Sequence, residues 1–156
     1  MREVLLSYEE GTPPLEQNLE HLVLEKIPKM LALATESSGA LSLFFCDIEK
    51  MKELNQAYRG KKSPTDVLSW VYEEDESEVF FGNIWGEIAL CVPVCQKQAE
   101  ESGWSLEVEL FRLLAHGIAH LAGFDHEQSE EEERQMLAEE IRLLREIGLD
   151  YVYRDD

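Results

Sequence analysis

The sequence is short of basic residues and of long apolar runs. Its 156 residues contain 14 lysines and arginines against 33 aspartates and glutamates, a formal net charge of −19 at pH 7. Such an excess argues against general binding of nucleic-acid backbones, which is mostly electrostatic. No apolar stretch approaches the roughly 20 residues that cross a bilayer. We therefore expect no DNA partner and no membrane partner.

Cysteine is also scarce, and its use indicates the compartment. Cys46, Cys91 and Cys95 are an odd number, and each lies in or beside an apolar run, so we predict buried thiols in a reducing compartment. Cys91 and Cys95 have the spacing of a metal pair, but Pro93 lies between them and no second pair follows. Residues 1–7 are too short and too soon acidic for a signal peptide. The prediction is a cytoplasmic protein.

The length and composition are those of a globular protein. With 44% hydrophobic residues and no low-complexity tract, residues 1–156 are expected to form a single domain. A chain of this size buries roughly 70% of its unfolded surface. Several strands among several helices, without strict alternation, predict an α+β fold with one four-stranded mixed sheet and about five helices.

Helix starts are marked by side chains that accept hydrogen bonds from free backbone N–H groups. Asp47, Ser105 and Ser129 are such N-caps, and Thr12 before Pro13 is typical of a further helix start. Together with the apolar patterns, these signals predict helices over about 12–35, 47–58, 93–102, 105–121 and 129–148. Strands are expected in 4–7, 40–46, 67–72 and within 83–91, and a loop over 73–78.

Three of the four histidines lie within eleven residues. His116 and His120 are four apart, so on a helix they share one face. Gly123 can turn the chain through a left-handed conformation and bring His126 back toward them. Three imidazoles with an open fourth position are typical of catalytic zinc, whereas structural zinc usually has four protein ligands. The alternative is an ordinary buried helix with solvent-facing histidines.

The helix that carries His116 is apolar on several sides, which predicts a central position and a rigidly held histidine face. Glu109 lies seven residues before His116 on the same face. We expect a solvated glutamate there, with orientation of a metal ligand as the alternative. The fourth histidine, His21, has no partner at metal spacing and is interpreted as structural or exposed.

Five of the 14 basic residues fall within 13 positions of one another. Lys50 and Lys52 are interpreted as a solvated helix face. Arg59, Lys61 and Lys62 fall around a glycine turn, where side chains and backbone can meet a phosphate together. From the residues alone, a surface arginine after a helix explains Arg59 equally well.

Three blocks of sequence resemble one family, the YbeY-type bacterial endoribonucleases. The family hallmark is similar to His-Gly-x-Leu-His-Leu-x-Gly-Tyr-Asp-His, matched by residues 116–126. A second block covers 54–60 and 64–70, and a weaker third covers 86–91. The resemblance spans about residues 40–147. The chain departs from the pattern, without loss of a ligand, at Lys62, Trp70, Glu87, Ala119 and Phe124.

The resemblance implies a function and a set of site residues. It implies a metal-dependent, single-strand-specific endoribonuclease of ribosomal RNA maturation, at the 3′ end of the small-subunit RNA, and of ribosome quality control. It implies one zinc ion held by His116, His120 and His126, with Arg59 as the functionally important arginine. The implied fold is α+β, related to that of zinc metalloproteases. The implied partners are single-stranded ribosomal RNA and the small ribosomal subunit or its proteins.

Two other functions remain open. Zinc peptidases of the His-Glu-x-x-His type use the glutamate after the first histidine as general base, whereas this chain has Gly117 there. A peptidase would need a base from elsewhere. The second alternative is a ribosome-assembly factor with a mainly structural metal. Its acidic surface would suit basic ribosomal proteins, and the residues around Arg59 would meet RNA.

Overall fold

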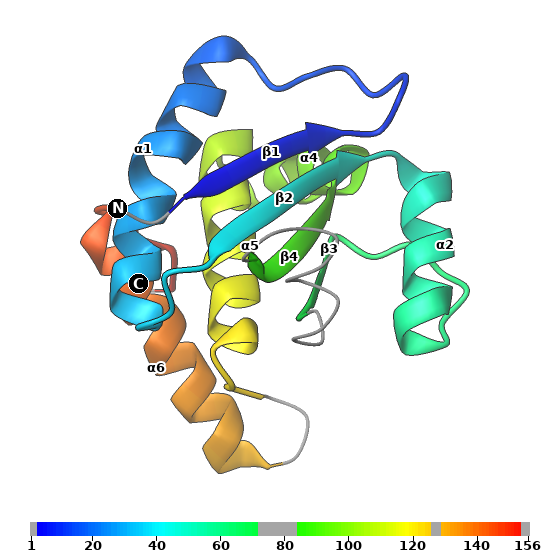
Figure 1. The fold of residues 1–156 in the computed structure, drawn as a ribbon. Coiled ribbons are helices and arrows are strands. Elements are labelled where there is room, and N and C mark those ends of the chain that lie inside the picture. Colours follow the sequence, from blue (N-terminus) through cyan, green and yellow to red (C-terminus); the bar gives the residue numbers. More distant parts are fainter. Residues whose placement is uncertain (1–2, 72–83, 126–128, 154–156) are drawn as a thin grey trace.

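A four-stranded mixed sheet lies at the centre of the fold (Figure 1). The structure is a computed structural model and describes residues 3–71, 84–125 and 129–153. Across the sheet the strands are β1 (Val4–Tyr8), β2 (Ala40–Cys46), β4 (Ile84–Cys91) and β3 (Val67–Trp70). β1 and β4 flank β2 in parallel, and β3 pairs with β4 antiparallel. β3 is therefore an edge strand, and the predicted α+β class is confirmed.

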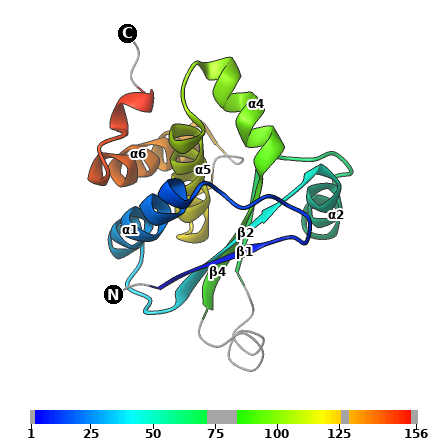
Figure 2. The same cartoon turned by 90° about the horizontal axis from the view of Figure 1, so that it is seen from above.

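The described ranges contain five α-helices. They are α1 (Gln17–Ala34), α2 (Ile48–Arg59), α4 (Val92–Ser102), α5 (Leu106–Leu121) and α6 (Glu130–Glu146), followed by the 3₁₀ helix η1 (Asp150–Tyr153). Of the five, α6 packs on α5 and α1, and the others lie on the sheet. The helices α1, α5 and α6 lie on one side of the sheet, with α4 beside α5, whereas α2 lies on the other side (Figure 2). One face of the sheet is thus covered by more helices than the other. At the β3 edge, α5 lies on one face and α2 on the opposite face (Figure 2).

The core follows this arrangement. The main apolar cluster joins buried residues of β2 and β4 to those of α1, α5 and α6. A smaller cluster, formed by Cys46, Met51, Leu68, Ala89 and Cys91, holds α2 against the opposite face. Ten of the sixteen α5 residues are buried, which confirms the central position predicted for this helix.

The predicted N-caps form the expected hydrogen bonds. Asp47 Oδ1 accepts from the backbone N–H of Ile48 at 2.7 Å. Ser105 Oγ accepts from the backbone of Val108 at 3.2 Å, and Ser129 Oγ from Glu132 at 3.1 Å. Each cap lies within three residues of its partner, so these three helix starts are decided locally.

The predicted start of the first helix at Thr12 and Pro13 is wrong, because α1 begins at Gln17. Proline disfavours the helical conformation of the residue before it, and Pro13 is itself followed by Pro14. Residues 12–16 therefore stay outside the helix. The strand expected over 67–72 ends at Trp70, and the loop expected over 73–78 lies outside the described residues.

Two glycines allow α5 to lie directly on β4. A Cβ at Gly117 of α5 would come within 2.8 Å of Ile88 Cδ1, and a Cβ at Gly86 of β4 within 2.8 Å of Leu121 Cδ1. A larger side chain at either position would require the end of the facing side chain, Ile88 or Leu121, to move. The orientation of the histidine-bearing half of α5 is therefore fixed by close packing.

All three cysteines are free and buried, as predicted. Burial raises the pKa of the Cys46 thiol to about 12. These thiols stay protonated at neutral pH and act as small apolar core residues. Within the described ranges, no helix has the length and apolar character to cross a membrane.

Candidate functional site

A pocket of about 250 Å³ lies at the β3 edge of the sheet. Its lining comes from the end of α2, from β3 and from the second half of α5: Tyr58, Arg59, Val67, Leu68, Ser69, Trp70, His116 and His120. The helices α2 and α5 lie on opposite sides of the sheet (Figure 2). Because both of them and β3 contribute lining residues, the pocket spans the sheet edge. The edge strand thus brings together two sequence blocks about 60 residues apart.

Two of the three predicted metal ligands line this pocket. His120 is exposed, and the His116 side chain is 31% exposed. Gly123 follows α5 with a φ of 107°, the left-handed turn expected after the helix. His126, the third predicted ligand, lies outside the described residues. Within residues 3–71, 84–125 and 129–153, no group of three or more metal-ligating side chains occurs.

Glu140 of α6 holds the ring of His116. Its Oε1 lies 3.3 Å from His116 Nδ1, and only 6% of Glu140 is exposed. A proton on Nδ1 donated to this carboxylate leaves the lone pair on Nε2, the form that a metal ligand needs. The contact therefore favours one ring orientation and one tautomer.

Glu109 is fully buried, so the expectation of a solvated glutamate is wrong. Arg112 donates two hydrogen bonds to its carboxylate, at 2.9 and 2.7 Å. Gln98 donates another at 2.7 Å, and Trp104 a fourth at 3.1 Å. Burial alone would raise the pKa of Glu109, but these donors hold it below its usual value.

Glu109 is joined to His116 through intermediate side chains. Arg112 hydrogen-bonds Tyr153 of η1, whose hydroxyl donates to Glu140 Oε1 at 2.9 Å. Burial raises the pKa of Tyr153, so its hydroxyl stays protonated and keeps donating to Glu140. These contacts form one connected series of side chains: Glu109, Arg112, Tyr153, Glu140 and His116. It ties the histidine face of α5 to both α6 and η1.

Arg59 is the last residue of α2 and lies at the mouth of the pocket. Gly60 follows in the left-handed conformation, with a φ of 69°, and ends the helix. Buried Asn55 donates from Nδ2 to the backbone oxygen of Ser63 at 2.8 Å, which fixes the turn after Arg59. A guanidinium in this position suits bidentate binding of a phosphate.

None of the four lysines near Arg59 in the sequence lines this pocket. Lys61 and Lys62 are exposed in the turn after Arg59 and do not line it. Lys50 and Lys52 form ion pairs one helical turn away, with Glu53 at 3.5 Å and Glu49 at 3.3 Å. The interpretation of Lys50 and Lys52 as a solvated helix face is confirmed. Lys61 and Lys62 stay a prediction as substrate-binding residues.

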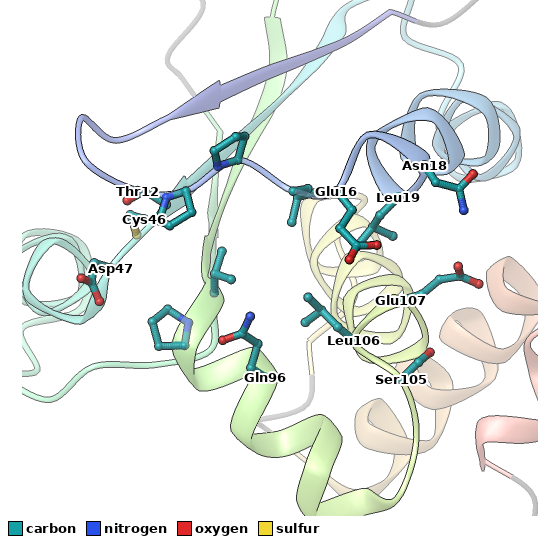
Figure 3. Close-up of a pocket in the computed structure, with 15 residues that line it drawn as sticks. Thr12, Glu16, Asn18, Leu19, Cys46, Asp47, Gln96, Ser105, Leu106 and Glu107 are labelled. Carbon is teal, nitrogen blue, oxygen red and sulfur yellow. The ribbon is translucent and has the colours of Figure 1, made fainter.

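A larger cavity, of about 540 Å³, lies at the other end of α5. Its walls come from residues 12–19 and from the ends of β2, α4 and α5, and Figure 3 shows Glu16, Leu106 and Gln96 around it. It contains none of the predicted site residues. At 1.5 Å per residue, its α5 wall lies roughly 15 Å from His116 along the helix. The predicted site residues His116, His120 and Arg59 line the smaller histidine pocket.

Several pocket and support residues were missed from the sequence. The rings of Tyr58 and Trp70 stack with centroids 4.5 Å apart and an interplanar angle of 15°. The burial of Glu140 could have been predicted from the sequence, because its spacing places it in the apolar stripe of α6 with Met136 and Leu144. A carboxylate in such a stripe needs a buried partner. For Tyr58 and Trp70, the pairing depends on how α2 packs on the sheet.

Comparison with known proteins gives consistent results. The sequence model of the family described as Endoribonuclease YbeY matches residues 8–148. A protein of that name from Brevibacillus brevis is 37% identical over 151 residues, covering 90% of this chain and 94% of the relative. One from Staphylococcus saprophyticus is 38% identical over 132 residues, covering 80% and 86%.

A solved structure has the same fold. The solution structure of TM1509 from Thermotoga maritima matches with a TM-score of 0.63 and 25% sequence identity, covering 98% of this chain and 97% of that protein. The family match thus covers the whole pocket, including His116, His120 and Arg59. The chain belongs to the YbeY endoribonuclease family.

Proposed function

We propose that this protein is a metal-dependent, single-strand-specific endoribonuclease. Its proposed substrate is ribosomal RNA, at the 3′ end of the small-subunit RNA, in maturation and ribosome quality control. The proposal rests on one observation, which is that His116, His120 and Arg59 line the same pocket. In this proposal residues 1–156 act as a single domain. Three buried cysteines without a disulfide support a cytoplasmic location.

The proposed metal is one zinc ion per chain, bound by His116, His120 and His126. The donor chemistry fits, because two imidazoles line the pocket and Glu140 supports His116 at Nδ1. Three neutral ligands leave the double charge of zinc uncompensated. When bound in this way, zinc lowers the pKa of a coordinated water to about 7 and polarises a phosphoryl oxygen.

The other pocket residues supply binding and orientation. Arg59 would bind a phosphate of the RNA at the mouth of the pocket and stabilise the negative charge that develops during cleavage. Glu140 would keep the His116 ring in its ligating orientation. Lys61 and Lys62, exposed beside Arg59, would contact the RNA on its way into the pocket.

The net charge of −19 favours a ribosomal context over free RNA. An acidic surface repels RNA outside the region of Arg59, Lys61 and Lys62, but it suits basic ribosomal proteins. The proposed partners are therefore ribosomal RNA and the small subunit or its proteins. The same observation favours the second candidate, an assembly factor in which the metal mainly holds structure.

A peptidase is disfavoured by the environment of Gly117. In a His-Glu-x-x-His enzyme the catalytic glutamate would occupy this position. Here Gly117 is buried and faces Ile88 of β4, where even a Cβ would come within 2.8 Å of that side chain. The position is used for packing α5 on the sheet, and a glutamate there would have to displace the end of the Ile88 side chain.

Cleavage of single-stranded ribosomal RNA by zinc-loaded protein tests the proposal, with Arg59→Ala and His120→Ala alongside. We expect the unaltered protein to cut the single strand and spare a duplex of the same sequence. Arg59→Ala should keep its zinc and lose cleavage, whereas His120→Ala should lose both.

The other outcomes separate the candidates. If all three proteins cut alike, the activity comes from a contaminant and the roles assigned to Arg59 and His120 are wrong. If fully metallated protein cuts no RNA but binds the small subunit, the assembly-factor function replaces the enzyme.

A further inference from the structure

One exposed aromatic side chain lies in the pocket beside Arg59. Tyr58 precedes it at the end of α2 and is 53% exposed, a high value for a tyrosine whose ring is packed on another ring. One face of the Tyr58 ring stacks on Trp70 of β3, nearly parallel to it. Trp70 packs against the small apolar cluster beneath α2. Tyr58 is therefore supported from below and open to solvent above.

This arrangement matches what proteins use to hold unpaired bases. Single-stranded nucleic acid is bound by aromatic rings on which bases stack, next to cations that contact the phosphates. Here the open ring and the guanidinium are adjacent in sequence and line the same pocket as His116 and His120. A nucleotide bound by its phosphate at Arg59 would have its base within reach of Tyr58.

We propose that Tyr58, backed by Trp70, is a stacking platform for one unpaired nucleobase of the RNA beside the cleaved phosphate. The inference rests on the proposed function and deepens it, since it names how a single strand is selected. A base inside a duplex is already stacked on both faces and cannot add the Tyr58 ring to its stack. The platform therefore favours unpaired RNA without reading its sequence.

A purely structural role for Tyr58 is the competing explanation, because its ring also covers Trp70. Two substitutions distinguish the roles. Tyr58→Phe keeps the ring and removes the hydroxyl, whereas Tyr58→Leu keeps apolar bulk over Trp70 but offers no flat π face. Tyr151 in η1 provides a matched control, because it is 49% exposed and does not line the pocket.

The measurement is the affinity for a short fluorescein-labelled single-stranded RNA, by fluorescence anisotropy in a metal chelator so that the RNA stays intact. Tyr58→Leu should bind roughly 5- to 100-fold more weakly. Tyr58→Phe and Tyr151→Ala should bind like the unaltered protein. A 2-aminopurine placed beside the cleavage site should lose fluorescence on binding, and Tyr58→Leu should abolish that quenching.

An abasic RNA completes a double-mutant cycle. Removing the stacked base should weaken binding to the unaltered protein but not to Tyr58→Leu. If Tyr58→Leu and Tyr58→Phe bind RNA equally well, or if the two losses simply add, the platform is overturned. A protein that neither binds nor cuts single-stranded RNA in any form would instead overturn the proposed function on which the platform rests.

Discussion

Glu140 illustrates how much of this site depends on a single buried carboxylate. It accepts a hydrogen bond from Tyr153 and lies 3.3 Å from His116 Nδ1, while 6% of the residue is exposed. A carboxylate so enclosed needs hydrogen-bond donors. The neutral Nδ1–H tautomer of His116, whose Nε2 is available to a metal, supplies one.

Replacing Glu140 with glutamine should weaken zinc binding by roughly 10- to 100-fold, the usual effect of losing a carboxylate behind a histidine ligand. Competition with a chromophoric chelator measures the affinity. Glu139→Gln is the matched control, because Glu139 is equally buried on α6 but pairs with Arg142. Equal zinc affinity of Glu140→Gln and the control would show that Glu140 does not orient His116.

At the scale of elements, the contact between α5 and β4 decides where the histidines stand. Gly86→Ala should destabilise the fold by about 1–3 kcal/mol, because its Cβ would come within 2.8 Å of Leu121 Cδ1. Urea denaturation measures the loss. In a Leu121→Ala background, which removes the obstructing side chain, the same substitution should cost less. Equal costs in both backgrounds would mean that the two residues do not limit the approach of α5 to β4.

The first half of α5 carries a pH-dependent contribution to stability. The lowered pKa of Glu109 means that its ionised form is favoured in the folded state. Its stabilisation is therefore complete above the unfolded pKa of about 4.3 and is lost as the pH falls through the folded value. Glu109→Gln should cost roughly 3 kcal/mol at pH 7, since Arg112 loses its buried partner.

Denaturant unfolding of the unaltered protein and Glu109→Gln from pH 7 down to pH 2 measures this contribution. The two free energies of unfolding should converge as the pH decreases, because protonation of Glu109 removes from the unaltered protein the charge that the glutamine variant already lacks. A difference that stays constant over this range would show that the Glu109 charge does not stabilise the fold.

At this scale, the sequence predicts features that depend on neighbouring residues better than features that depend on residues from other elements. Helix starts at Asp47, Ser105 and Ser129 were predicted correctly because each cap bonds within its own first turn. The start at Thr12 was wrong because consecutive prolines keep that segment extended. Glu109 was misjudged for a different reason. Its burial depends on Gln98 and Trp104 from outside α5, and helical spacing carries no information about them.

At the scale of the whole molecule, the pocket depends on topology. The spacing of His116 and His120 predicts a shared helix face, but their meeting with Arg59 depends on β3 lying at the sheet edge between α2 and α5. Glu140 and Tyr153 reach the site only through the packing of α6 and η1. The family resemblance anticipated the association of Arg59 with the histidines. Composition and spacing alone left the role of Arg59 open.

The charge distribution predicts a weak salt dependence of RNA binding. Three cations, Arg59, Lys61 and Lys62, lie at or beside the pocket of a chain with a net charge of −19. At roughly 0.7 released ions per phosphate contact on a single strand, the slope of log affinity against log salt should not be steeper than about −2. Anisotropy titrations over a salt series measure the slope. A slope near −5 would indicate a larger basic surface than the one proposed.

The central claim is that the clustered histidines hold one zinc ion, and metal content tests it most directly. Zinc per chain, measured by elemental analysis after dialysis, should be one for the unaltered protein and for His21→Ala, which alters the exposed histidine of α1. It should fall close to zero for His116→Ala and His120→Ala when both remain folded by circular dichroism. Full zinc content in these two folded variants would contradict the proposed metal site.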